Sequence, residues 1–77
     1  MPRFYFDVRH DGKVIADTEG EDHPDIAAAK REAGVAAIHI AKERLSGVRD
    51  TLIVEARDES GRPVARAKVS FDIEDAE

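Results

Sequence analysis

One segment, residues 24–45, constrains the fold most, because its small apolar residues recur with the spacing of a helix. Six of them fall on one stripe at 3.6 residues per turn. They are Ile26, Ala29, Ala33, Ala36, Ala37 and Ile40. Since the stripe is mostly alanine, we expect this helix to lie close to a sheet. Pro24 is predicted at the first helical position with His23 as the cap residue, and Ser46-Gly47 as the stop.

Four segments, two on each side of this helix, alternate between apolar and polar residues, which is the period of a half-buried strand. They cover residues 3–9, 14–17, 51–57 and 64–73. The order predicts an α+β fold, ββαββ, with a four-stranded antiparallel sheet and one long helix packed on one face. A helix of about 21 residues spans roughly 32 Å and returns the chain to the other end of the sheet. We therefore expect the spatial strand order 2-1-3-4.

The turn His10-Asp11-Gly12-Lys13 allows two hairpin geometries. A two-residue Asp-Gly turn pairs Val8 with Ile15, whereas a three-residue turn pairs Val8 with Val14. The second geometry points Val14 to the same face as the apolar residues of the first strand. We therefore favour the three-residue turn.

Composition excludes several classes of protein. The 77 residues include no cysteine, which excludes a disulfide scaffold, a thiolate zinc site and a cysteine nucleophile. No apolar run approaches the length of a membrane span, and the N-terminus lacks the pattern of a signal peptide. We expect a cytoplasmic protein with one domain, residues 1–73, and a frayed acidic tail, residues 74–77.

The formal net charge is −5, and residues 17–25 hold five acidic residues and no basic residue. These acids are Asp17, Glu19, Glu21, Asp22 and Asp25. They suggest a cation site, but the EF-hand template fails, because its glycine comes too early and Ala28 stands where it needs glutamate. We interpret the segment as a solvated loop whose acids favour the nearby helix N-terminus, and we predict no metal site.

Neither histidines nor serines form a recognisable catalytic pattern. The histidines, His10, His23 and His39, fall in a turn, before the helix and on the helix, so we do not expect them to converge. The serines, Ser46, Ser60 and Ser70, lie outside any nucleophile elbow. The chain also has no glycine-rich phosphate loop. We expect no enzyme activity, no cofactor and no small-molecule ligand.

The outer face of the predicted sheet deserves comparison with nucleic-acid surfaces. It carries the basic and aromatic residues Arg3, Tyr5, Arg57, Arg66 and Lys68. Some RNA-binding sheets combine these residue types, but only Tyr5 can stack on a base, and acidic residues share the face. These are Asp7, Glu55 and Asp72. We therefore predict cross-strand charge pairs and no nucleic-acid binding.

Several apolar residues have no obvious place in the core. Val35 and Ile38 lie on the helix away from its apolar stripe, and Ile53 and Val64 are expected on the outer face of the sheet near Tyr5. Because a 77-residue chain buries a small core, these five residues form our candidate interface. We expect a non-enzymatic binding or assembly module whose partner is another protein or a second copy, as in a homodimer.

Four stretches of sequence resemble a family of short bacterial proteins, known from rhizobia and related soil bacteria, that is defined as domain of unknown function 6894. They are Met1-Pro2-Arg3-Phe4-Tyr5-Phe6-Asp7-Val8, Asp17-x-Glu19-Gly20, Pro24-Asp25-Ile26, and Val54-Glu55-Ala56-Arg57-Asp58-Glu59-x-Gly61-Arg62-Pro63. The resemblance covers nearly the whole chain and implies no activity or site residue.

A weaker resemblance is to small antitoxin domains of the HicB type, which also place two strands and an acidic loop before an alanine-containing helix. It rests on pattern alone. It gives an alternative function, a regulatory subunit that binds a toxin or a promoter complex.

Overall fold

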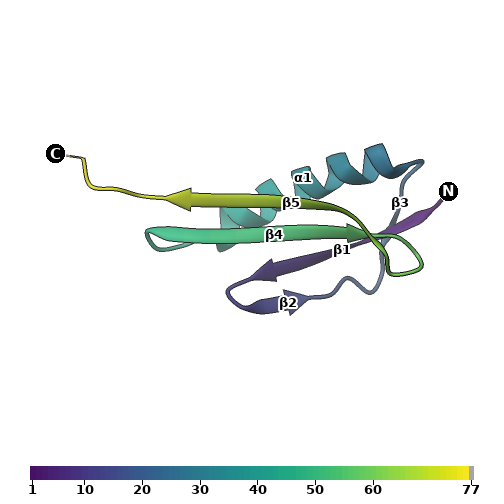
Figure 1. Ribbon diagram of the computed structural model, residues 1–77, viewed down its shortest axis with the longest axis horizontal. Coiled ribbons are helices and arrows are strands. Elements are labelled where there is room, and N and C mark those ends of the chain that lie inside the picture. Colours follow the sequence, from purple (N-terminus) through teal and green to yellow (C-terminus); the bar gives the residue numbers. More distant parts are fainter. Residues whose placement is uncertain (77) are drawn as a thin grey trace.

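The computed structural model describes residues 1–76, with one helix on one face of an antiparallel sheet (Figure 1). In chain order the elements are β1 (Arg3–His10), β2 (Lys13–Ile15), β3 (Glu21–Asp22), α1 (Ile26–Arg44), β4 (Arg49–Arg57) and β5 (Pro63–Asp72). The α+β class is confirmed. The prediction of four strands misses β3, a two-residue strand that makes the sheet five-stranded. Within residues 1–76, the helix is not long and apolar enough to cross a membrane.

The spatial order of the main strands is β2-β1-β4-β5, as predicted. The central pair, β1 and β4, is antiparallel, with Val8 opposite Val54. β3 pairs with the start of β1, where Phe4 lies opposite Glu21. The two edges of the sheet are therefore formed by β5 on one side and by the short strands β2 and β3 on the other.

The first hairpin differs from the predicted three-residue turn. Val8 lies opposite Ile15, so the turn has two residues, Asp11 and Gly12. Both have positive φ, 55° and 74°, which matches the twist of the flanking strands. All three residues of β2 are exposed. Because the helix does not cover β2, burying Val14 gave the other register no advantage.

The helix also starts later than predicted, and His23 is not its cap. Asp25 has extended backbone, and its Oδ1 accepts a hydrogen bond from the Ala28 N–H at 2.8 Å. A short carboxylate reaches this unpaired N–H better than an imidazole does. At the other end, the Leu45 N–H donates to the Ala41 carbonyl, close to the predicted stop.

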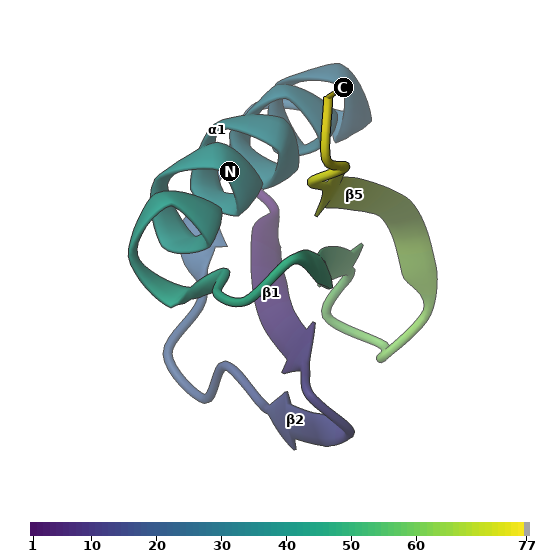
Figure 2. The ribbon, with the colours of Figure 1, turned by 90° about the vertical axis from the view of Figure 1, so that its left-hand side faces the viewer.

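The core lies between the alanine stripe of α1 and the middle of β4. The buried helix residues are Ala29, Ala33, Ala37 and Ala41. Ala33 and Ala37 pack in one cluster with Leu52, Val54 and Ala56, each of which has no exposed surface. Small side chains let the helix lie close to the sheet, as predicted, but Ile26 is 49% exposed. Figure 2 shows the helix on one side of the sheet only, and it packs mainly on β4 and β5.

A β-bulge places Val64 differently from the prediction. Ala56 lies opposite Ala65, but Arg57 lies opposite Pro63, so Val64 is the extra residue in β5. Val64 is half-buried and packs against the core cluster on the helix side. The expectation that Val64 points to the outer face is therefore wrong, because alternation along a strand is interrupted at a bulge.

Candidate functional site

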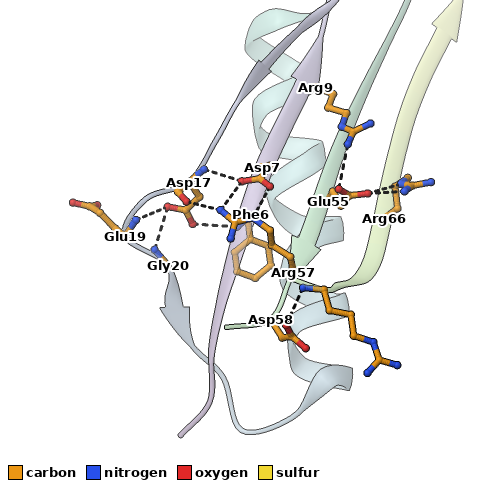
Figure 3. Close-up of polar contacts among 11 residues, drawn as sticks. Phe6, Asp7, Arg9, Asp17, Glu19, Gly20, Glu55, Arg57, Asp58 and Arg66 are labelled. Carbon is orange, nitrogen blue, oxygen red and sulfur yellow. Dashed lines mark hydrogen bonds and ion pairs between the residues drawn. The ribbon is translucent and has the colours of Figure 1, made fainter. Parts of the chain in front are cut away.

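The face of the sheet opposite α1 is not covered by a helix or strand of residues 1–76 (Figure 2). Its charged side chains come from alternate residues of β1, β4 and β5. They include Asp7, Arg9, Glu55, Arg57, Arg66 and Lys68. Asp7 and Glu55 are nevertheless buried, with 9% and 6% of their surface exposed. The predicted cross-strand charge pairs are present and bury both carboxylates (Figure 3).

Asp7 is held between Arg57 and the backbone of Asp17. Arg57 Nε donates to Asp7 Oδ2 at 2.8 Å, and the Asp17 N–H donates to Asp7 Oδ1 at 2.9 Å. Burial raises the pKa of Asp7, but the hydrogen bonds from Arg57 and Asp17 together lower this pKa below its ordinary value of 3.8. Arg57 also lies over the Tyr5 ring, 4.8 Å from its centroid, which fixes the guanidinium in place.

Asp17 uses its carboxylate to organise the loop before β3. Its Oδ1 accepts hydrogen bonds from the N–H groups of Glu19 and Gly20, and its Oδ2 accepts one from the Phe6 N–H. Burial raises the pKa of Asp17, but the three hydrogen bonds lower it by more than burial raises it. The pKa is therefore below its ordinary value of 3.8, and the carboxylate is stabilised in its charged form.

Gly20 permits this loop to approach β1 closely. Its φ is +76°, and a Cβ at this position would lie 2.9 Å from Phe4 O, Arg3 Cγ and Tyr5 Cε1. A positive φ and a contact with backbone oxygen both exclude a side chain here. Glycine at position 20 is therefore required by local geometry.

Glu55 is the second buried carboxylate of the uncovered face. Arg66 donates to Glu55 Oε2 from Nε at 3.0 Å and from Nη2 at 2.6 Å, and Arg9 Nη2 donates to Oε1 at 3.3 Å. The two arginine side chains remain half or more exposed, while that of Glu55 is not. The two arginines thus cover the carboxylate from both neighbouring strands, Arg9 from β1 and Arg66 from β5.

The five candidate interface residues do not form one patch. Tyr5 and Ile53 lie on the uncovered face of the sheet, and Val64 packs on the helix side. Val35 and Ile38 lie on α1 and are 43% and 65% exposed. The structure therefore brings Tyr5 and Ile53 to the same face and separates them from the helix residues.

The free edge of β5 is a candidate site that the sequence reasoning did not identify. Within residues 1–76, β5 pairs only with β4, and none of its ten residues is buried. Its inner-face residues, Ala65, Ala67, Val69 and Phe71, are half-buried, whereas the outer ones are exposed. The predicted order 2-1-3-4 already placed the last strand at an edge, which was the available signal.

The five acidic residues of positions 17–25 are spread over separate contacts. Asp17 binds backbone, Asp25 caps α1, Asp22 pairs with Arg3, and Glu21 lies 3.1 Å from His23. Among residues 1–76, no three histidine or acidic side chains are grouped as a metal site.

The histidines likewise lie apart. His10 Nε2 lies 3.0 Å from Asp50 Oδ2, the His23 ring packs on Phe4 and Phe6, and His39 is exposed on the helix. The hydrogen bond with His10 makes the largest contribution to lowering the pKa of Asp50 below its ordinary value. We therefore find the imidazoles in structural contacts or in solvent.

The turn between β4 and β5 is organised by Asp58. Its Oδ1 accepts hydrogen bonds from Ser60 N–H, Ser60 O–H and Arg62 N–H. These bonds lower the pKa of Asp58 below its ordinary value, and the bond from the Ser60 hydroxyl has the largest effect. The turn thereby fixes where β5 begins.

Three of the four sequence stretches quoted above for the family resemblance meet around the carboxylate of Asp7. β1 supplies Asp7, the loop supplies Asp17 and Gly20, and β4 supplies Arg57 (Figure 3). Tyr5 of β1 lies against the Arg57 guanidinium. No curated protein and no solved structure matches the chain. The family model described as domain of unknown function (DUF6894) matches residues 3–70, and the chain belongs to this family.

Proposed function

We propose that this chain is a non-enzymatic protein-association module that binds an extended strand of its partner along the free edge of β5. The observation that carries the proposal is the exposure of β5, a ten-residue strand that has no buried residue and, in the described part of the chain, a neighbour on one side only. The edge of such a strand presents unpaired N–H and C=O groups that a second strand can bind.

The hydrogen bonds of β5 indicate which residues face the edge. The Ile73 N–H donates to the Val48 carbonyl at 2.7 Å, and this pair continues the register of β5 with β4. In an antiparallel pair such bonds recur at every second residue. Val69 and Phe71 therefore bond to β4. The residues with outward backbone groups are Arg66, Lys68, Ser70 and Asp72.

The beginning of β5 is less accessible than its second half. Pro63 has no N–H to offer. Pro63 and Val64 line a shallow depression together with Ile26 and Lys30 of α1, so the helix start lies beside this end of the strand. The available edge is residues 66–72.

The uncovered sheet face is a weaker candidate than this edge. Its two buried carboxylates, Asp7 and Glu55, already receive hydrogen bonds from Arg57, Arg9 and Arg66. Charges used within the chain leave less to offer a partner. The edge, in contrast, retains backbone groups that bind strands of many sequences.

A proline at position 70 tests the proposal. Ser70→Pro removes an outward N–H without removing a bond to β4, whereas Ser70→Ala retains that N–H. The readouts are the mass of the purified chain by sedimentation over the micromolar range, and capture of proteins from native extract. We expect wild type and Ser70→Ala to associate, with themselves or with an extract protein, and Ser70→Pro to fold but not associate.

Association that is equal in the two variants would overturn the β5 edge as the binding surface. Capture of a small basic protein by wild type but not by Ser70→Pro would identify the partner of an antitoxin-like subunit that uses this edge.

A further inference from the structure

We infer that the strand bound at this edge is β5 of a second copy, antiparallel to the first, with the two-fold axis passing through Val69. The inference rests on the proposed function, since it names the partner of the same edge. It is supported by the pattern of charges along β5, which is complementary to itself when one copy is reversed.

Symmetry restricts the possible registers. In an antiparallel pair, the residues whose backbone N–H and C=O groups point to the open edge of one strand must lie opposite the corresponding residues of the other strand. On β5 these are the even-numbered residues 66–72. A two-fold axis must then pass through one residue of each strand, which faces its own counterpart. The candidates within the open segment are Ala67, Lys68, Val69 and Ser70.

Charge excludes two of these four registers. An axis through Lys68 places two ammonium groups directly opposite each other, and an axis through Ala67 places Arg66 opposite Lys68. Like charges directly opposite each other destabilise a strand pair. An axis through Val69 instead places Arg66 opposite Asp72 twice, and one through Ser70 places Lys68 opposite Asp72.

The extent of pairing favours the axis through Val69. This register pairs residues 66–72, all within β5, whereas the axis through Ser70 pairs only residues 68–72 before the strand ends at Asp72. The longer register forms more backbone hydrogen bonds.

The Val69 register also continues a row of alternating charge. In one copy Arg66 pairs with Glu55 at 2.6 Å, and Arg49 pairs with Asp72 at 3.4 Å. With Asp72 of the second copy opposite Arg66, the row becomes Glu55, Arg66, then Asp72 and Arg49 of that copy. Complementary charges of this kind set register more than they add affinity.

The opposite face of the pair is apolar. Val69 faces its counterpart, and Ala67 faces Phe71 twice, and all of these side chains are only half-buried in one copy. Residues that lie directly opposite each other in paired strands point to the same face of the sheet. The helices of the two copies therefore both lie on this apolar face. A second copy therefore covers apolar surface that α1 leaves open.

The helix presents an exposed row toward the same edge. Lys30, Gly34 and Ile38 follow one another at four-residue spacing and share one side of α1. Lys30 lies beside Pro63 and Val64 of β5, which places this row on the β5 side of the helix. Ile38, 65% exposed, is then directed toward the helix of the second copy.

Single cysteines test the register directly, because the chain has none of its own. The probes are Val69→Cys, Ser70→Cys and Lys68→Cys, oxidised under mild conditions and separated on a non-reducing gel. In the proposed register Val69 and its counterpart form a non-hydrogen-bonded pair with Cα atoms about 4.5 Å apart, within the range that a disulfide bridges. Counterparts at position 70 or 68 are offset along the strands and lie about 8 Å or more apart.

We expect a disulfide dimer with Val69→Cys and little with the other two variants. Preferential cross-linking of Ser70→Cys or Lys68→Cys would overturn the register. A wild type that stays monomeric but captures an extract protein, with capture lost in Ser70→Pro, would overturn the second copy as partner and leave the proposed function intact.

A charge variant provides a second measurement if Val69→Cys does not fold. Asp72→Arg places like charges opposite Arg66, so we expect the dimer dissociation constant to rise about 3- to 30-fold. Asp75→Arg, in the exposed segment after β5, makes the same change of charge outside the pair and serves as the control. Equal dissociation constants for the two variants would contradict the inference.

Discussion

The carboxylate of Asp17 occupies the position of a missing strand beside Phe6. Its Oδ2 accepts the Phe6 N–H at 3.1 Å, at a point where β2 has ended at Ile15 and β3 has not yet begun at Glu21. One side chain thereby joins two short strands into a continuous cover for the edge of β1. The loop can do this because Gly20 lets it turn against the strand.

Gly20→Ala is expected to destabilise the chain more than Gly61→Ala does. Both glycines have positive φ, 76° and 88°, but only at Gly20 would a Cβ meet other atoms, at 2.9 Å. The conformational penalty is about 1–2 kcal/mol in both variants, and overlap with the backbone of Phe4 adds about 1–3 kcal/mol at Gly20. Urea unfolding measures the difference, and equal losses would show that the loop moves away freely.

Acid is expected to destabilise the fold through Asp7 and Asp17. The pKa of each carboxyl is lower in the folded chain than its ordinary 3.8, so the unfolded chain binds more protons in this range. Their contribution is therefore complete above the unfolded pKa and is lost as pH falls through the folded pKa, beginning below about pH 5. Unfolding free energies measured between neutral pH and about pH 3 should fall steeply.

Asp17→Asn should flatten this pH dependence, because the amide does not titrate. Glu59→Gln, a change at an exposed position of the β4–β5 turn, is the matched control and should leave the slope as in wild type. A slope unchanged in Asp17→Asn would mean that other carboxyls cause the acid sensitivity.

Ala37→Leu is expected to separate the helix from the sheet. Ala37 has no exposed surface and packs against the cluster that contains Leu52 and Val54. Three extra carbon atoms overfill this space and cost about 1–3 kcal/mol. Ala27→Leu, at an exposed helix position, makes the same change outside the buried stripe and should be close to neutral. Thermal unfolding of the two variants checks the prediction.

Ile38→Ser and Val35→Ser should differ in their effect on self-association. Both side chains are exposed on α1, but only Ile38 shares a row with Lys30 on the β5 side of the helix. Loss of apolar area at Ile38 should raise the dimer dissociation constant, by about 10-fold if 1.4 kcal/mol of contact is lost, while Val35→Ser leaves it unchanged. Sedimentation equilibrium gives both constants, and a larger effect at Val35 would place the contact on another side of the helix.

The fold class, the strand order and the alanine stripe were predictable because they depend on periodic patterns. Alternation and helical spacing hold over many residues, so single exceptions such as the exposed Ile26 do not change the result. The predicted charge pairs on the outer face were also correct, since strand pairing brings alternate residues such as Glu55 and Arg66 opposite each other.

Other features depend on one or two residues and escaped prediction. The first hairpin follows the positive φ of Asp11 rather than burial of Val14. The bulge at Val64 depends on how the turn after Arg57 closes, and β3 depends on the reach of Asp17. The role of Asp17 has no sequence signal beyond an acid three residues before a glycine, because one of its partners is the backbone N–H of Phe6, on a strand that is distant in sequence.

Asp17 and the short strands cover the outer edge of β1, so the sheet has one edge open to a further strand. β2 has three residues and β3 two, too short for lasting addition of a further strand, so only β5 can extend the sheet. In the proposed symmetric pair, that single open edge of each copy is occupied. Growth of the sheet would then end with two copies, and the exposed ten-residue strand would not be available for fibre formation.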